Sequence, residues 1–456
     1  MKDLTQGAIH KHLLSMAAPM AIGMLVQTLY YLIDLYFVSR LGAHALAGVG
    51  AGGSVAFLVL ALTQALSVGT VTLVSHAVGR KDQAEANLVF NQSLLLAAAC
   101  AALTVFGGYV LADPYLHRIS ADPETMRAGI TYLYWYTPGL ALQFALATMG
   151  AALRGTGVVK PTMLVQMLTV LINIILAPVL IAGWGTGHPL GVAGAGLAST
   201  IAVAVGVIVM GYYFAKLETY VGYDAAQIRP RWALWKRMLN IGAPAGGEFA
   251  CMFVLMAVVY HIVAPFGAAA QAGFGVGSRV MQAIFLPVMA IAFAVAPIAG
   301  QNFGAGQFAR VRETLVTAIC IESVLMVLLT ALCQINPAWL IRPFASDASV
   351  IAVGAQYLHI ISWNFVATGI VFACSGLFQA LGNTWPAFIG MALRVLTFVL
   401  VALWLSRQPG FTMNQVWYLS VATVALQAVV ALLLVRTQLN RRLAASTAAA
   451  AAMAPA

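Results

Sequence analysis

Charged side chains are scarce in this sequence. Its 456 residues include only 13 Asp+Glu and 23 Lys+Arg, so charge makes up 8% of the chain, against about 25% in an ordinary soluble domain. Hydrophobic residues reach 62%, and the mean hydropathy is +0.92. A soluble fold of this composition would expose large contiguous apolar patches. The sequence therefore predicts an integral membrane protein and excludes a soluble one.

Cysteine is also rare and follows no pattern. The chain has five, an odd number, all in apolar stretches, so neither a disulfide framework nor a zinc site is indicated. The net charge of +10 comes without a basic cluster interleaved with aromatics, which excludes a nucleic-acid groove. We find no paired acids, metal-ligand cluster or Ser/His arrangement for a catalytic centre, so we expect neither an enzyme nor a cofactor.

What the sequence does have is long apolar runs. Nearly uncharged stretches of 18 or more residues recur along the whole chain, which is typical of membrane-spanning helices. Breaks at charged or Gly/Pro-rich segments predict an all-α polytopic protein with twelve transmembrane helices, near 13–33, 48–74, 91–112, 129–150, 162–182, 191–214, 241–263, 274–298, 314–334, 351–375, 387–406 and 415–436.

The basic residues are distributed unevenly between the two sets of connections. One set holds 16 Lys or Arg, and the other holds five: Arg40, Arg118, Arg127, Arg342 and Arg407. Cytoplasmic loops carry the excess of positive charge, so we expect both termini in the cytoplasm. Arg279 and Arg394 fall within spans, near helix ends, where such side chains snorkel to the interface.

The chain repeats itself at an offset of 225 residues. Pro19 and Pro161 correspond to Pro244 and Pro386, and glycines between them repeat in the same register. Two homologous six-helix bundles follow, 1–215 and 241–440, joined by a cytoplasmic linker at 216–240 and followed by a tail at 441–456 that we expect to be disordered. Each half has an even number of spans, so we expect a pseudo-twofold axis along the membrane normal and alternating access at a central cleft.

Several segments resemble one family of transporters. Ser75–Asp82 and its repeat partner Gly300–Gln307 resemble the paired connections of the multidrug and toxic compound extrusion (MATE) family, of the bacterial NorM/DinF-like type. Further similar segments are Leu32–Gly42, Leu153–Gly157, Asn173–Pro178 and Gly191–Ala198. The resemblance covers roughly residues 10–440. It implies a multidrug efflux antiporter in the bacterial cytoplasmic (inner) membrane that exports organic, often cationic, compounds in exchange for H⁺ or Na⁺.

Asp34 is the first candidate for cation coupling. An acid near the bilayer centre costs about 2.5–3.5 kcal/mol on insertion scales, so its presence there indicates function. Gln27, Tyr30, Tyr31 and Asp34 recur at helical spacing and form one polar stripe. The first-helix Asp of MATE proteins is the usual cation-binding acid, and the resemblance implies that role for Asp34. The alternative is an acid at the outer helix end, in headgroups or water.

Two further residues complete the predicted coupling set. Asn173 could supply a neutral ligand beside Asp34, or else hydrogen-bond between helices. Glu248 resembles the seventh-helix Glu of NorM-like proteins, although it comes about one turn early, or it is a helix N-terminal acid facing water. The tenth helix has no acid where that branch carries Asp, which disfavours a complete sodium site in the second half.

The remaining predictions concern the substrate walls and Glu322. We expect Met20, Met24 and Gln143, with the polar stripe of the first helix, to line the substrate path, since methionines and aromatics suit a pliable cavity for flat cations. Methionine stripes are more often plain packing. Glu322, in the middle of the ninth predicted helix, is either structural or active in transport.

The leading interpretation is an H⁺-coupled antiporter, acting as a monomer on small organic molecules. A proton needs one carboxyl whose affinity for it changes, whereas Na⁺ needs several oxygens, although Na⁺ at Asp34 stays possible. The alternatives are a lipid-linked oligosaccharide flippase of the same superfamily, which would need several arginines in its cleft, and a non-catalytic channel.

Overall fold

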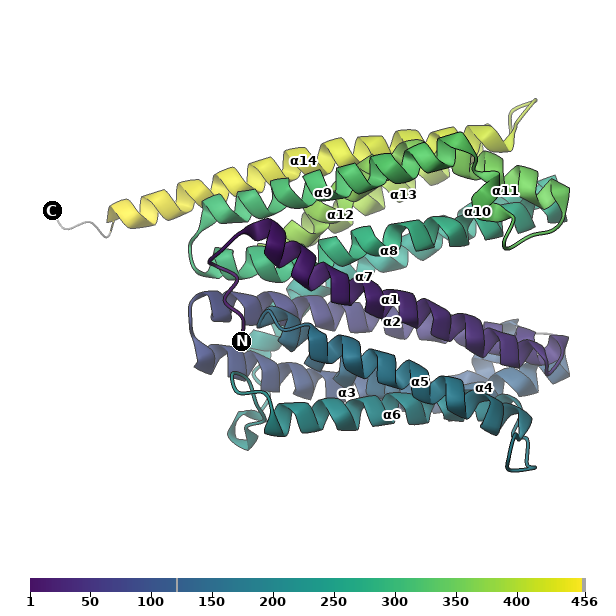
Figure 1. The fold of residues 1–456 in the computed structure, drawn as a ribbon, viewed down its shortest axis with the longest axis horizontal. Helices are drawn as coiled ribbons and strands as arrows, with labels where there is room; N and C mark the ends of the chain where they lie inside the picture. The colour runs from purple at the N-terminus through teal and green to yellow at the C-terminus, as the bar shows by residue number, and fades with distance from the viewer. Residues whose placement is uncertain (120–121, 453–456) are drawn as a thin grey trace. The chain divides into compact units, whose positions relative to one another are not determined.

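The structure, a computed structural model, describes the backbone of residues 1–119 and 122–452. In this part of the chain every regular element is helical (Figure 1), which confirms the predicted all-α membrane fold. The α-helices and short 3-10 helices (η) are α1 (Ile9–Ser39), α2 (Ala43–Gly79), α3 (Gln83–Ile119), α4 (Pro123–Gly155), α5 (Lys160–Ala182), α6 (Val192–Lys216), η1 (Ala225–Gln227), α7 (Trp232–Val263), η2 (Ala264–Phe266), α8 (Ala268–Gly304), α9 (Phe308–Ile335), α10 (Ala338–Ile341), α11 (Ala348–Ile361), η3 (Ser362–Asn364), α12 (Phe365–Ala380), α13 (Trp385–Leu405) and α14 (Met413–Ala452).

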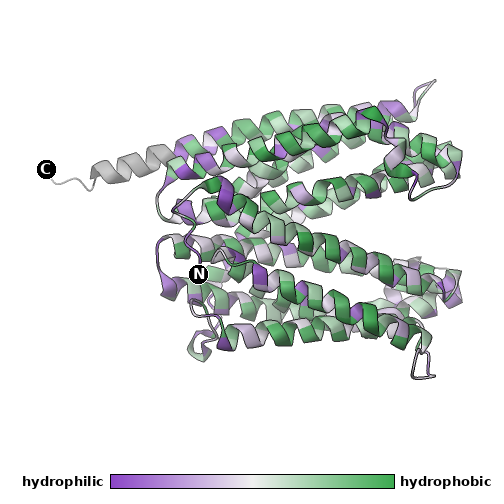
Figure 2. Ribbon diagram, viewed as in Figure 1, coloured by the Kyte–Doolittle hydropathy of each residue, from purple (hydrophilic) through white to green (hydrophobic). Residues whose placement is uncertain are grey.

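Eleven helical stretches in the described residues are long and apolar enough to cross a membrane. The α11–η3–α12 stretch, Ala348–Ala380, counts as one of them. Helix α4 is the remaining one of the twelve predicted spans. Its 33 residues include three tyrosines and a tryptophan, so its length suits a span while its hydropathy falls below that of the eleven stretches. Apolar residues cover most of the helices (Figure 2), as a lipid-facing surface requires.

The 225-residue repeat is visible in the helix ends. Helix α2 runs from Ala43 to Gly79 and α8 from Ala268 to Gly304, so both ends differ by 225 (268 minus 43, 304 minus 79). Glycines explain part of this agreement. Gly42 and Gly267, which precede these helices, have φ of 106° and 96°. An L-residue with a side chain rarely adopts that backbone conformation, so both turns need glycine.

The first compact unit comprises Met1–Asp3 and Ala18–Gly246. Within it α4 packs against α2, α3 and α6, and α5 packs against α6. Its core holds fully buried aromatic side chains, among them Phe90, Phe144 and Phe214, and the rings of Phe90 and Phe214 stack with centroids 4.6 Å apart. The unit includes the whole predicted linker, 216–240, and α7 already begins within that range, at Trp232.

Amide side chains at the start of α3 hold the linker in place. Gln92 donates to the carbonyl of Arg229 (2.8 Å) and accepts from the N–H groups of Arg231 (2.9 Å) and the Trp235 indole (3.0 Å). Gln83 and Asn91 donate in the same way to linker carbonyls. Since these bonds satisfy backbone groups that have no helix to pair with, the linker is a defined structure.

The second compact unit comprises Leu4–Ala17 and Gly247–Ala456. Helix α8 lies at its centre, in contact with α9, α11 and α12, and α14 packs against α12 and α13. The rings of Phe274, Tyr357 and Trp417 form an aromatic cluster with centroids 4.8 to 5.3 Å apart. Helix α14 continues to Ala452, into the predicted disordered tail, and residues 453–456 of that prediction lie outside the described part.

The N-terminal segment belongs to this second unit, whereas we predicted 1–215 as one lobe. Leu4, Ile9 and Leu13 are fully buried. The Leu4 N–H donates to Oε1 of Gln301 (2.9 Å), and Nδ2 of Asn302 donates to the Leu4 carbonyl (3.2 Å). The Gly300–Gln307 motif thus holds the segment by its backbone, a contact that no periodicity in the sequence reveals.

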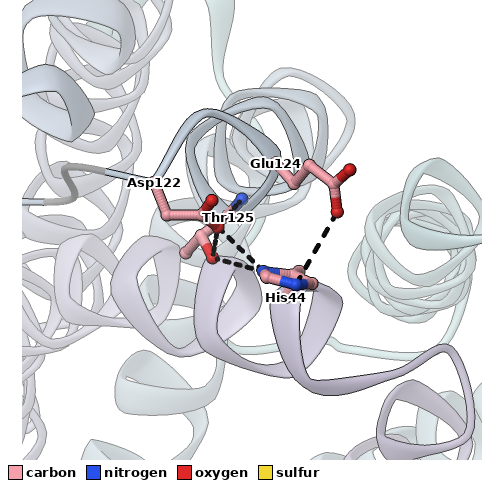
Figure 3. A network of polar contacts seen from close by, with 4 residues as sticks. All are labelled: His44, Asp122, Glu124 and Thr125. Carbon is pink, nitrogen blue, oxygen red and sulfur yellow. Dashed lines mark hydrogen bonds and ion pairs between the residues drawn. The ribbon is translucent and has the colours of Figure 1, made fainter.

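Matching aspartates begin corresponding helices of the two repeats. Asp122 caps α4 and Asp347, 225 residues later, caps α11, each accepting from a backbone N–H. Hydrogen bonds from the Thr125 hydroxyl and N–H lower the pKa of Asp122 to about 2, so its carboxylate stays charged at ordinary pH. The carboxylate also bonds His44 at 2.8 Å, and Glu124 lies 3.7 Å from the other ring nitrogen (Figure 3), which ties the start of α2 to that of α4.

Candidate functional site

Asp34 lies within the apolar helix α1 of the first unit. Its Oδ1 atom is inaccessible to solvent and has no hydrogen-bond partner among the described residues. A buried carboxylate that lacks a partner is costly, and binding of a proton or another cation removes that cost. Asp34 therefore has the property expected of a coupling residue.

Four tyrosines are within electrostatic range of this carboxyl group: Tyr30 and Tyr31 on α1 and Tyr132 and Tyr136 on α4. Tyr132 and Tyr136 are buried, with ring centroids 5.1 Å apart, whereas Tyr31 is 58% exposed. One acid is thus grouped with aromatic rings, and such rings attract organic cations through their faces.

Polar groups of α5 and α6 reach the same region. Asn173 and Ser199 are buried, and Asn173 Nδ2 donates to Ser199 Oγ at 3.3 Å. Ser199 Oγ also shares a 2.6 Å hydrogen bond with the hydroxyl of Tyr30, one turn before Asp34. The carbonyl oxygen of Asn173 is buried and has no partner in the described structure, so it is free to accept from a ligand.

The polar stripe of α1 continues toward the helix start. Gln27 accepts a hydrogen bond from Gln166 of α5 at 3.0 Å and bonds the hydroxyl of Tyr31. Gln166 in turn lies against Gly23, where a Cβ would stand 2.7 Å from its Oε1. The structure therefore brings together the predicted residues Gln27, Tyr30 and Tyr31, with Asp34 and Asn173 in the same unit.

Three further lining residues were predicted. Met24 precedes Asp34 by ten residues, about 15 Å along a helix, and Met20 is one turn further away. Both are half-buried, as is Gln143 on α4. Their place on the substrate path stays a prediction.

Glu248, the third predicted coupling residue, lies in the second unit. Its Oε2 accepts a hydrogen bond from Ser375 of α12 at 3.1 Å. It lines a small pocket together with Cys374, Ser375 and Gln427, and the buried Oε1 of Gln427 has no partner among the described residues. A second acid thus lies in a mostly apolar pocket, with Ser375 and Gln427 as its polar neighbours.

Sequence reasoning missed several polar members of these two sites. Ser199 is one of a Ser–Thr pair in the otherwise apolar α6, and Tyr132 and Tyr136 are spaced i, i+4 on α4. Those patterns could have singled them out. Ser375 and Gln427 had no comparable signal, because helix packing alone brings them near Glu248.

Comparisons with known proteins agree with the duplicated helical fold. The sequence profile of the MatE family matches residues 19–179 and 244–404, two blocks again separated by 225. The chain is 26% identical over 416 residues to the probable multidrug resistance protein YpnP of Bacillus subtilis, covering 91% of this chain and 90% of that one. It is 27% identical over 379 residues to the FAD transporter of Shewanella oneidensis, covering 81% and 83%.

Solved structures share the fold. The crystal structure of MATE in complex with MaL6 superposes with a TM-score of 0.90 at 24% identity, covering 96% of this chain and 98% of that one. Two matching profile blocks, the helical membrane fold and the duplicated helix order lead to one conclusion: this chain is a non-enzymatic membrane transporter of the MatE family, the multidrug and toxic compound extrusion proteins.

Proposed function

We propose that this transporter is a secondary antiporter that exports organic, often cationic, compounds in exchange for H⁺. The observation that carries the proposal is the Asp34 carboxyl group, whose Oδ1 has no partner in the described structure and which lies among four tyrosines. A flavin dinucleotide, the cargo named for one relative, carries phosphates that this acid would repel.

Exchange follows from competition for one carboxyl group. With a proton bound, Asp34 is neutral and no longer attracts a cation. Without it, the carboxylate attracts an organic cation, whose flat groups stack on the tyrosine rings. Since the two ligands cannot both neutralise the same charge, entry of a proton from one side displaces the cation to that side. No further coupling device is needed for antiport.

The donor set favours H⁺ over Na⁺. Sodium prefers several oxygen ligands around a fixed carboxylate, by analogy with other hard cations. The hydroxyl oxygens of Tyr30 and Ser199 are bonded to each other, and the side-chain N–H of Asn173 donates to Ser199. Among the hydrogen bonds of the described residues, none brings these groups to Asp34.

The coupling ion can be tested with purified protein in liposomes. We expect export of a fluorescent organic cation to follow an imposed pH gradient in sodium-free buffer, because the gradient drives protonation of Asp34 and protonation displaces the cation. One pH unit supplies about 1.4 kcal/mol per proton. A sodium gradient at equal pH serves as the control. Export that stops when sodium is withheld, with the pH gradient intact, would show that Na⁺ is the coupling ion.

We further propose that the protein acts as a monomer in the bacterial cytoplasmic membrane. Both termini lie in the cytoplasm in this proposal, because the loops on that side carry the excess of Lys and Arg. In a variant lacking the five natural cysteines, Arg231→Cys should react only with reagents inside the cell and Arg342→Cys from outside. Both side chains are exposed, so access depends on the side of the membrane. Labelling of position 231 from outside sealed cells contradicts this orientation.

A further inference from the structure

A second carboxyl group without a partner lies in the middle of α9. Glu322 is 0% exposed, and neither of its oxygens has a hydrogen-bond partner among the described residues. Its neighbours on the same face of α9, Ala318 and Met326, are also fully buried. The acid therefore lies inside the second unit, where it contacts neither lipid nor water.

Glu322 lies beside Gly369 of α12. A Cβ added to Gly369 would lie 3.4 Å from the Glu322 Cβ and 3.6 Å from its Oε2, both ordinary contact distances. The carboxyl group is thus separated from the backbone of α12 by about the space of one methyl group.

Farther along, α9 contacts a break between two helices. Thr330 and Gln334 follow Glu322 by two and three turns, and they are one turn apart on a common face of α9. Thr330 donates to the carbonyl of Ser362 (3.0 Å) and Gln334 to its hydroxyl (2.8 Å). Ser362 begins η3, the 3-10 turn between α11 and α12, and such turns inside a helix mark hinges.

The break has an acceptor of its own. Oδ1 of Asn364, the last residue of η3, is buried without a partner in the described structure. Membrane transporters bind ions where spanning helices are interrupted, because the interruption leaves polar groups free at membrane depth. Hydroxyl and amide groups therefore gather where α9 contacts this break, two to three turns along α9 from Glu322.

Few titratable groups on the surrounding elements could hold this acid in one state. Cys374, the one such group on α12, interacts electrostatically with Glu322. Arg279 of α8 and His359 of α11 are exposed, and Tyr357 of α11 bonds the sulfur of Met281. No basic group on these helices neutralises Glu322, so the ligand that does so has to come from solution.

A purely structural acid would look different. Buried polar groups in proteins are hydrogen-bonded in the great majority of cases, and an isolated buried charge is costlier still. Glu322 in its buried position is thus neutral and carries a proton, yet it makes no hydrogen bond that would offset the free-energy cost of its burial. Retention of such a group in a span points to use in transport.

Cys374 connects this acid to the Glu248 pocket. It is next to Ser375, the hydrogen-bond partner of Glu248, and it lines the same pocket. Consecutive residues of α12 thus face two acids, on α7 and α9. Any movement of α12 about the η3 turn would therefore change the surroundings of both acids together.

We propose that Glu322 is a second proton-carrying residue of the transporter, which holds a proton while buried and releases it to water when α12 moves away from α9. This inference rests on the proposed H⁺-coupled antiport and adds to it a second proton in each cycle. One proton exchanged for one monovalent cation moves no net charge. Two protons exchanged for it move one charge, so membrane voltage also drives export.

The first test does not depend on transport. The infrared carbonyl band of protonated carboxylic acids should be weaker in purified Glu322→Gln than in the parent at neutral pH, because Gln removes the acid and keeps its size. Glu313→Gln is the matched control, since Glu313 is exposed on the same helix. Equal bands in the parent and the Glu322→Gln variant overturn the proposal.

The second test measures charge movement in liposomes. With a pH gradient and a monovalent cation as substrate, an imposed voltage should accelerate export by the parent and by Glu313→Gln, and leave Glu322→Gln unaffected. A parent that ignores voltage, or a Glu322→Gln variant that keeps the response, overturns the second proton site. A parent that does not respond to the pH gradient at all contradicts the proposed function instead, so the two failures are distinct.

Discussion

The Asp34→Asn variant is expected to lose pH-driven export while it still folds and inserts. Asn has the size of Asp and forms similar hydrogen bonds, but it neither binds a proton nor carries a charge. A contact to a charged group contributes about 1.5–3 kcal/mol, so affinity for an organic cation should fall roughly 10- to 100-fold. Uptake into liposomes and equilibrium binding to detergent-purified protein measure the two effects separately.

Asp113→Asn is the matched control for this experiment. Asp113 lies near the end of α3 and is exposed, so the same change of charge there should leave both binding and export at the parental level. Asp34→Asn protein that exports at the parental rate would show that Asp34 is not the coupling residue. Loss of export in both variants would point to a general effect of net charge.

The sequence was sufficient to place the helices along the chain, although many run several residues past the predicted ends, as α1 does from Ile9 to Ser39 where 13–33 was predicted. Helix boundaries in a membrane follow from apolar length and from Gly, Pro and capping residues, all of which are local. Asp122 and Asp347 cap corresponding helices for this reason. The polar stripe around Asp34 was equally readable, because residues spaced three and four apart on one helix share a face.

Contacts between residues of different helices could not be predicted from the spacing of residues along one helix. Ser199 joins the Asp34 region through Tyr30, and Ser375 joins Glu248, because separate helices pack together. The interruption at Ser362–Asn364 was also missed, since no proline or glycine marks it. Its counterpart in the first repeat carries Pro138 inside the unbroken α4, so the repeat could have suggested a bend there.

The N-terminal segment shows the same limit. Its residues from Leu4 to Ala17 were predicted to precede and begin the first span, 13–33, of the first lobe, yet they pack in the second unit. Leu4 is held by side chains of Gln301 and Asn302, almost 300 positions away in the sequence. A partner so distant leaves no trace in local periodicity. Domain limits predicted from the linker alone therefore assigned this segment to the first lobe.

The second large effect is expected at Gly242 of α7, where two helices of the first unit approach most closely. A Cβ at this position would lie 1.9 Å from the carbonyl oxygen of Ala65 on α2, and that atom is backbone. Small residues allow membrane helices to pack this tightly, and a side chain has to push the helices apart. Overpacking costs about 1–3 kcal/mol, occasionally more. Gly242→Ala should therefore lower the thermal midpoint of detergent-purified protein, and Gly242→Val should yield little folded protein.

Two other glycines make the experiment graded. A Cβ at Gly246, one turn further along α7, would lie 2.7 Å from the carbonyl oxygen of Ala61, so Gly246→Ala should be less harmful. Nothing lies within 4 Å of a Cβ at Gly53 on α2, so Gly53→Ala should be neutral or stabilising, because alanine favours a helix by about 1 kcal/mol over glycine. Thermal midpoints should rise in the order Gly242→Ala, Gly246→Ala, Gly53→Ala. Equal midpoints for the three variants would mean that α2 and α7 do not approach at these carbonyls in the folded protein.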